Sequence, residues 1–302
     1  MLQQFDPRNS DLIVNIGGDL TPRDQAGVSP FDSSVQGGDA VWEGLRLYEG
    51  KIFRLEQHLD RLDSSAKAMA FVDIPSRESI VEEIRRTLEA NNMTDGVHIR
   101  LTLTRGLKVT SGMDPRLNQS GPTLIVLAEW KAPVYSAKGL CLITSSVRRF
   151  PPDCLDPNIH HANLAQSILA KIEANQAGAD DAIMLDKDGF VAETNATNIF
   201  LVDSGVVRTP RAIACPEGVT RAAILDICAA ADISAFEEDL SLTRFYRSEE
   251  VFCTGTMGEL APVLEIDGRV IGNGEPGQLM LKLSGLFQEL VLSEGFPLVN
   301  HS

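Results

Sequence analysis

Three short segments of this chain carry residue types that suit anion binding or proton control. Residues 193–198 (ETNATN) place one carboxylate before small and amide side chains, between two apolar runs. Residues 215–221 (CPEGVTR) form a glycine turn before a predicted helix, where free backbone N–H groups and the Thr220 hydroxyl can face an anion. Residues 253–258 (CTGTMG) combine a strand end with a turn of small residues. Either turn alone is also typical of a plain helix cap or tight turn, whereas the carboxylate segment is unusual for a mere loop.

Apolar patterns predict the elements that must position these segments. The predicted helices are 53–71, 76–92, 163–176, 219–231 and 277–292. The predicted strands are 11–16, 97–104, 122–129, 140–147, 182–185, 190–193, 199–202 and 250–253, with further short strands near 264 and 270–271 and a hairpin turn at 186–189. These elements predict a mixed α/β protein with a small domain over 1–130, a linker at 131–137 and a larger domain over 138–302.

The composition excludes several classes of protein. The 302 residues include 27 Lys and Arg against 42 Asp and Glu, and the net charge of −15 opposes binding to nucleic acid or to an anionic membrane surface. No apolar run reaches the ~18 residues that span a bilayer, and the first residues lack the pattern of a secretory signal. The five cysteines are widely spaced without a CxxC pair, which predicts free thiols in the cytoplasm and no zinc site.

Five segments taken together resemble the class IV aminotransferases, the fold type IV pyridoxal-phosphate enzymes. They are residues 38–46 (GDAVWEGLR), residues 54–62 (RLEQHLDRL), the Glu193 segment, the turn at 218–221 and the turn at 255–256. The resemblance extends from about Asp11 to about Leu292. It implies a two-domain fold type IV architecture, with pyridoxal 5′-phosphate (PLP) or pyridoxamine 5′-phosphate between the domains of a subunit that forms homodimers.

The resemblance also implies roles for individual residues. Arg61 matches the arginine that holds the cofactor phosphate, and a guanidinium suits a phosphate dianion. Glu193 matches the carboxylate that pairs with the pyridine nitrogen and keeps the ring protonated, so that the ring accepts electrons. The rest of the phosphate site would come from Val219, Thr220, Gly255 and Thr256.

The family's essential lysine, which forms a Schiff base with the cofactor and moves the substrate's Cα proton, has no counterpart here. It precedes the asparagine that matches Asn163 by three or four residues, and those positions hold His160 and Ile159. The three-residue spacing of the lyase and D-amino-acid relatives selects His160. Lys171, eleven residues along a predicted helix, is ~16 Å away. The turn and linker lysines that remain candidates are Lys131, Lys138 and Lys187.

Three interpretations follow from this replacement. In the first, the chain is an aminotransferase scaffold with noncovalent cofactor and crippled turnover. In the second, His160, with or without His161, takes over proton transfer, since an imidazole forms no stable imine but titrates near pH ~6.5. In the third, the protein is a pseudoenzyme or works without PLP on the same fold. Two adjacent histidines without a third ligand make a metal site unfavourable.

The substrate side is defined by fewer residues. Arg100 matches an arginine at the substrate side of branched-chain relatives, and Arg105 matches a carboxylate-binding arginine of D-amino-acid relatives. Residues five apart on one strand point to opposite faces, so only one of the two should enter the site, and Arg100 is favoured. Trp42 and Gln36 replace pocket aromatics of the branched-chain relatives, and Met257 lies in the third segment. The implied substrates are an amino acid, branched-chain by preference, and a 2-oxo acid.

Overall fold

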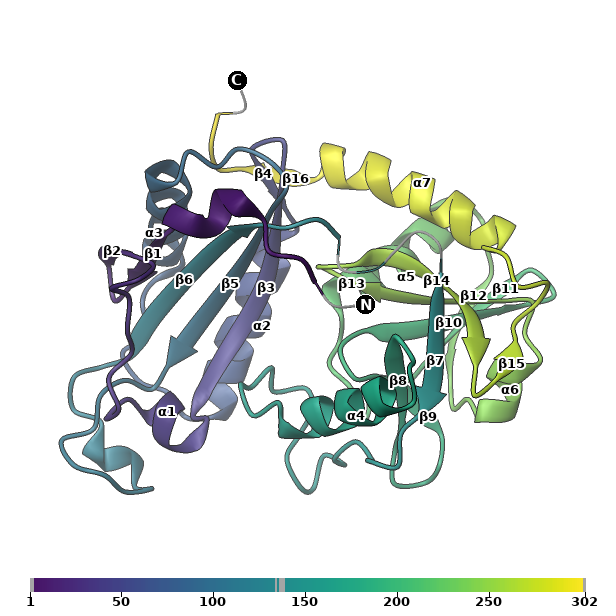
Figure 1. Ribbon diagram of the computed structural model, residues 1–302, viewed down its shortest axis with the longest axis horizontal. Coiled ribbons are helices and arrows are strands. Elements are labelled where there is room, and N and C mark those ends of the chain that lie inside the picture. Colours follow the sequence, from purple (N-terminus) through teal and green to yellow (C-terminus); the bar gives the residue numbers. More distant parts are fainter. Residues whose placement is uncertain (1–2, 134, 136–138, 301–302) are drawn as a thin grey trace. The chain divides into compact units, whose positions relative to one another are not determined.

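The computed structural model describes residues 3–133, 135 and 139–300, so residues 134, 136 and 137 of the predicted linker and Lys138 lie outside the described residues. The chain divides into two compact units (Figure 1). Within the described residues, the first unit comprises 3–132, 159–163 and 291–300, and the second comprises 133, 135, 139–158 and 164–290. Residues 159–163, which include His160, therefore pack with the first unit although their neighbours on both sides belong to the second.

The first unit is built on a seven-stranded sheet in which every pair of neighbours is antiparallel. The strand order is β16-β4-β3-β5-β6-β1-β2. The strands are β1 (Ile13–Ile16), β2 (Asp19–Pro22), β3 (Ala40–Tyr48), β4 (Lys51–Phe53), β5 (Val97–Thr104), β6 (Thr123–Trp130) and β16 (Gly295–Pro297). The helices are α1 (Ser33–Gly37), α2 (Leu55–Ala68) and α3 (Arg77–Ala90), with 3₁₀ turns at Pro7–Asp11 and Pro115–Leu117.

The strand β3 contributes one row of side chains to the core of this unit and another row to the opposite face of the sheet. Val41, Leu45 and Leu47 are fully buried and belong to the same apolar cluster as the inner faces of α2 and α3. Side chains alternate along a strand, so Trp42 and Arg46 point to the opposite face of the sheet. Glu43 points to the same side as Val41, Leu45 and Leu47. It is buried as they are, but it carries a carboxylate.

The second unit holds a nine-stranded sheet with mixed strand directions. Its order is β12-β11-β10-β13-β14-β7-β8-β9, with β15 paired to β14, and three pairs are parallel. The strands are β7 (Leu140–Thr144), β8 (Asp181–Leu185), β9 (Val191–Thr194), β10 (Asn198–Asp203), β11 (Val206–Pro210), β12 (Ala235–Glu238), β13 (Glu250–Gly255), β14 (Glu259–Ile266) and β15 (Arg269–Val270). The helices are α4 (Ala165–Gln176), α5 (Val219–Ala230), α6 (Leu242–Tyr246) and α7 (Gln278–Ser293).

The predicted elements are present, with shifts at their ends. The five predicted helices correspond to α2, α3, α4, α5 and α7. The predicted strand 140–147 is too long: β7 ends at Thr144, because Ser145 and Ser146 turn away to donate hydrogen bonds to Glu173. The predicted strand 11–16 begins only at Ile13, after a 3₁₀ turn.

Two general findings concern the described residues only. No helix among them is long and apolar enough to cross a bilayer. No group of three or more His, Cys, Asp or Glu side chains among them is arranged to share a metal ion.

Candidate functional site

Glu193 lies on β9 and is held by an arginine that the sequence patterns did not single out. Its Oε1 lies 2.9 Å from Nη2 of Arg149, and the Glu193 and Arg149 side chains are only 6% and 12% exposed. The same Nη2 donates to the carbonyl oxygen of Thr194 at 3.0 Å, and Nη1 donates to Oγ of Ser167 at 3.2 Å. A charge-assisted contact of this kind fixes both the position and the charge of the carboxylate.

The two glycine turns of the second unit are joined to the Glu193 segment through β10. Asn198, the first residue of β10, pairs with Thr254 of β13, and its Nδ2 donates to the carbonyl oxygen of Pro216 at 3.3 Å. A Cβ atom on Gly218 would lie 1.9 Å from Oδ1 of Asn198, and one on Gly255 would lie 3.2 Å from Cγ2 of Thr197. The structure therefore brings together the three segments that were selected from the sequence, and a side chain at position 218 would have to displace the Asn198 amide.

We expect Gly218→Ala to lower the free energy of unfolding by about 1–3 kcal/mol, because the new methyl group overlaps a buried amide. Denaturant unfolding followed by circular dichroism measures the change. Gly285→Ala in α7 is the matched control, since a Cβ there meets no atom within 4 Å and alanine favours a helix by up to about 1 kcal/mol. Equal free energies of unfolding for the two variants would contradict the close contact between position 218 and Asn198.

The same region presents hydrogen-bond donors that suit an anion. Helix α5 begins at Val219, and the first N–H groups of a helix have no acceptor within it. Thr220 follows and is buried, and the buried Oγ1 of Thr254 has no hydrogen-bond partner among the described residues. Thr256 and Met257 lie partly buried in the turn that Gly258 N closes by donating to the carbonyl oxygen of Gly255 at 3.2 Å.

His160 lies in the first unit beside β3. Its backbone N–H donates to Oγ of Ser65 at 3.0 Å, and its carbonyl oxygen accepts from the Trp42 N–H at 3.0 Å. Its ring stacks on the Trp42 ring with centroids 4.2 Å apart. The ring Nδ1 lies 2.6 Å from the Trp42 carbonyl oxygen and 3.2 Å from Oε1 of Glu43.

The buried Glu43 carboxylate accepts hydrogen bonds from α2 in the first unit. Arg61 donates to it twice, from Nε to Oε1 and from Nη2 to Oε2, each at 2.7 Å. His58 Nδ1 lies 2.7 Å from Oε2. Arg61, the predicted phosphate ligand, is thus oriented by a carboxylate that is fully buried.

The charges of this cluster shift two pKa values. Burial alone would raise the pKa of Glu43, but the His160 ring when it is protonated, together with the hydrogen bonds and charge of Arg61, outweighs burial and holds the pKa well below its ordinary value. Burial and the Arg61 charge lower the pKa of His160, although Glu43 and the Trp42 carbonyl act in the opposite direction. At neutral pH, the arrangement is therefore an ionised carboxylate beside a neutral imidazole.

The guanidinium of Arg100 lies over the Trp42 ring. The Arg100 Cζ atom lies 3.4 Å from the centre of the indole ring, and Trp42 Nε1 donates to the carbonyl oxygen of His161 at 3.1 Å. Burial lowers the pKa of Arg100 to about 10, while the Glu43 charge opposes this shift. Among the described residues, no hydrogen bond or ion pair of the Arg100 side chain is found, and Glu43 acts on this partly buried cation only through its charge.

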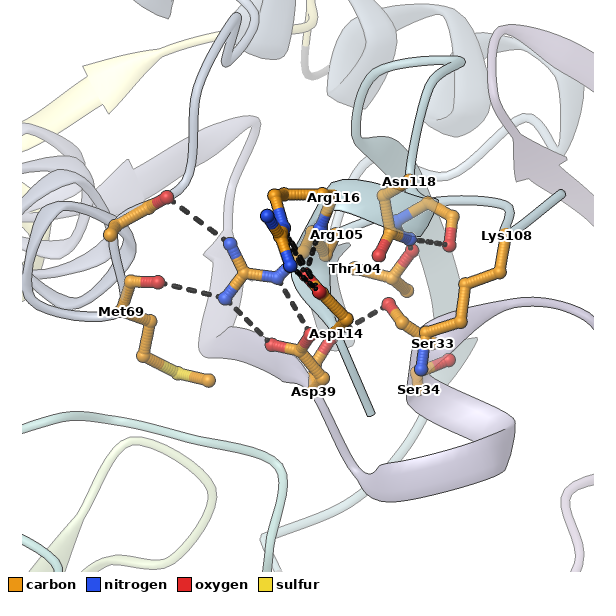
Figure 2. Close-up of polar contacts among 12 residues, drawn as sticks. Ser33, Ser34, Asp39, Met69, Thr104, Arg105, Lys108, Asp114, Arg116 and Asn118 are labelled. Atoms are coloured by element: carbon orange, nitrogen blue, oxygen red, sulfur yellow. Dashed lines mark hydrogen bonds and ion pairs between the residues drawn. The ribbon is translucent and has the colours of Figure 1, made fainter. Parts of the chain in front are cut away.

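Arg105 is engaged elsewhere, as Figure 2 shows. Its Nε and Nη2 donate to the two carboxylate oxygens of Asp39 at 2.7 and 3.1 Å, and Nη2 also donates to the Met69 carbonyl oxygen at 2.7 Å. The guanidinium lies over the ring of Phe71 at 4.3 Å. Because β5 ends at Thr104, Arg105 lies just beyond the strand and joins the segments around it.

The remaining predicted residues are placed as follows. Gln36 lies at the end of α1, exposed, with Nε2 donating to the Pro30 carbonyl oxygen at 3.1 Å. Lys171 pairs with Asp181 at 3.0 Å, Lys187 pairs with Asp188 at 2.8 Å, and Lys131 lies 4.0 Å from Glu129. These three lysines therefore have acidic partners within their own units.

Two residues that matter here, Arg149 and Glu43, received no role from sequence reasoning. Arg149 is one of two adjacent arginines after a predicted strand, and an arginine pair at a strand end is typical of a solvated surface. Glu43 lies inside the motif at 38–46 without a role of its own. Its signal is the single acidic residue in an otherwise apolar alternation of residues 41, 43, 45 and 47.

Comparison with known proteins identifies the family of this chain. Residues 40–266 match the amino-transferase class IV family. Branched-chain-amino-acid aminotransferase-like protein 2 of Arabidopsis thaliana is 55% identical over 293 residues, which cover 97% of this chain and 52% of the plant protein. The branched-chain-amino-acid aminotransferase of Pseudomonas aeruginosa is 33% identical to this chain. The alignment covers 93% of each of the two proteins. The chain therefore spans about half the length of the plant relative.

Solved structures show the same fold. The T.th. branched-chain amino acid aminotransferase, complexed with N-(5′-phosphopyridoxyl)-L-glutamate, superposes with a TM-score of 0.87 at 32% identity, covering 94% of this chain and 95% of that one. The same enzyme with pyridoxamine 5′-phosphate gives a TM-score of 0.86. This chain belongs to the class IV aminotransferase family. The family predicted from the sequence and its mixed α/β fold are confirmed, and the similar solved structures hold cofactors of the predicted class.

Proposed function

We propose that this chain binds PLP or pyridoxamine 5′-phosphate noncovalently and supports slow transfer of an amino group between an amino acid, branched-chain by preference, and a 2-oxo acid. The observation that carries the proposal is the buried Glu193–Arg149 pair beside the Gly218 and Gly255 turns, in a family whose members carry such cofactors. The slow rate follows from His160 at the lysine position.

The residues present fit the cofactor by three observations. A Cβ at Gly218 would overlap the Asn198 amide, Thr254 Oγ1 is buried without a partner among the described residues, and α5 opens with N–H groups that have no acceptor within the helix. We assign the phosphate to Val219, Thr220, Gly255 and Thr256, with Arg61 of the first unit, and the ring nitrogen to Glu193. Bound there, the cofactor supplies an aldehyde for the substrate amine and a protonated ring that takes up the electron pair left at Cα.

The chain's own residues would act by holding charge and moving one proton. Arg149 keeps Glu193 oriented, so that the carboxylate would hold a proton on the ring nitrogen. Glu43 orients the Arg61 guanidinium in a fixed direction. Trp42 presents the Arg100 cation, which we assign to a substrate carboxylate, and Gln36 and Met257 are assigned to the substrate side with them.

Cofactor retention tests this proposal. The protein is saturated with PLP, dialysed, and followed by absorbance, in parallel with pyridoxal, which lacks the phosphate. We expect PLP to be retained longer than pyridoxal because the phosphate site supplies most of the contacts, and we expect treatment with borohydride to leave no cofactor attached after denaturation. A covalent adduct would show that another lysine replaces the missing one. Absence of retention would favour a role without PLP.

Three further predictions from the sequence stand as proposals. They are the domain limits 1–130 and 138–302, assembly as a homodimer, and a cytoplasmic location. The last is supported by the cysteines, which are all free thiols in the described residues. We propose no nucleic-acid or membrane partner, given the net charge of −15.

A further inference from the structure

We infer that His160 is the proton-transferring base of this protein, acting through Nε2, and that Glu43 is the positioning residue that holds its Nδ1–H and stabilises its protonated form. This inference rests on the proposed function. It assigns a carboxylate–imidazole pair to the position where the family uses a lysine, and it is argued from contacts within the first unit alone.

The contacts of Nδ1 fix the tautomer of His160. Nδ1 lies 2.6 Å from the carbonyl oxygen of Trp42 and 3.2 Å from Oε1 of Glu43. Both neighbours are acceptors, and a carbonyl oxygen has no proton to donate. Nδ1 must therefore carry the hydrogen, which leaves the lone pair of the neutral ring on Nε2.

The adjacent histidine has the opposite arrangement. Nδ1 of His161 lies 3.2 Å from the backbone nitrogen of Asn163, whose N–H donates to it. Its Nδ1 is therefore the acceptor, and its hydrogen is on Nε2. Two neighbouring imidazoles with opposite tautomers provide an internal control for any measurement on His160.

Arg61 keeps Glu43 ionised beside His160, and the titratable groups that face this pair come from three elements. Glu43 comes from β3, His58 and Arg61 come from α2, and Arg100 comes from β5. The two Arg61 hydrogen bonds hold a negative charge next to Nδ1 although the Glu43 side chain is fully buried. Burial and Arg61 lower the pKa of His160, so the ring is neutral at pH 7 and able to accept a proton.

The chemistry balances as one proton transfer and its reversal. The Cα–H bond of the substrate breaks, Nε2 gains the proton, and the electron pair remains on the substrate–cofactor system. The imidazolium that forms keeps its Nδ1–H toward Glu43, as in the carboxylate–histidine pairs of hydrolases. Return of the proton from Nε2 restores the neutral ring, so no additional reactant is needed.

The first test uses the protein without cofactor. The chain has five histidines, so ¹⁵N-labelled imidazole spectra are simple to assign. At pH 7.5 we expect a protonated Nδ1 and a bare Nε2 for His160, and the reverse for His161. A His160 ring with its hydrogen on Nε2 would overturn the inference without a single substitution.

The second test measures the charge effect of Glu43. Glu43→Gln removes the negative charge that favours the imidazolium, so the titration midpoint of His160 should move to lower pH, while that of His161 should stay in place. An unchanged His160 midpoint would overturn the role of Glu43. If this buried substitution prevents folding, the His160 tautomer measured in the unmodified protein still tests the inference.

The third test addresses the proton itself. The PLP-loaded protein is incubated with leucine in D₂O, and loss of the Cα proton is followed by NMR. His160→Asn should slow exchange by about 10²–10⁴-fold, the range of general-base catalysis, whereas His161→Asn should leave it unchanged. Equal exchange in both variants would overturn the base role. Failure of the protein to retain PLP would overturn the proposed function and this step with it, but would leave the measured tautomer intact.

Discussion

His160→Lys is expected to raise the rate of amino-group transfer, because the lysine keeps the acid–base role assigned to His160 and adds the covalent attachment of the cofactor that an imidazole cannot provide. The lysine amine adds two capabilities that an imidazole lacks, a covalent bond to the cofactor aldehyde and a flexible reach to the substrate Cα. The substitution removes the Trp42–His160 ring stack, a loss of about 0.5–1.5 kcal/mol that the fold should tolerate. Steady-state transfer from leucine to 2-oxoglutarate measures the rate, and borohydride should now attach the cofactor to residue 160.

His161→Lys is the matched control for this gain. It adds the same side chain one residue away, at a ring whose Nδ1 accepts from Asn163 rather than donating to Glu43. We expect no covalent cofactor and no gain in rate from it. If His160→Lys likewise gains nothing, the match between His160 and the family's lysine is wrong.

Glu193→Gln is expected to cost about 3–5 kcal/mol of unfolding free energy, because it leaves the guanidinium of Arg149 without its charge partner in a largely buried place. The amide also cannot hold a proton on the cofactor's ring nitrogen, so any amino-group transfer should fall with it. Denaturant unfolding of the cofactor-free protein measures the first effect separately from the second.

Asp188→Asn is the control for Glu193→Gln. It is also an acid-to-amide change in an ion pair of the second unit, but Lys187 and Asp188 are 60% and 61% exposed. Exposed pairs contribute about 0–1 kcal/mol, so this variant should unfold nearly as the unmodified protein does. A loss below about 1 kcal/mol in Glu193→Gln would show that Arg149 finds another partner or water.

Local patterns were sufficient to predict most elements. The helices α2 and α3 have apolar residues at helical spacing and bury that face, so periodicity located them within a few residues. The strand β3 was not predicted as a strand. Its alternation is interrupted by Glu43, and a buried carboxylate makes sense only once the donors from α2 are in place.

The sequence by itself determined the family and the class of fold, and it predicts that His160 stands at the lysine position, because these depend on residue types at fixed spacing. Tertiary structure decided which charges meet. Glu43 and His160 are 117 residues apart, and Arg149 reaches Glu193 from a different segment of the chain. It also showed Arg105 bound to Asp39, while Arg100 remains on the Trp42 ring. Spacing along a chain cannot reveal such pairs, because the strength and sign of an electrostatic interaction depend on distance and burial in three dimensions.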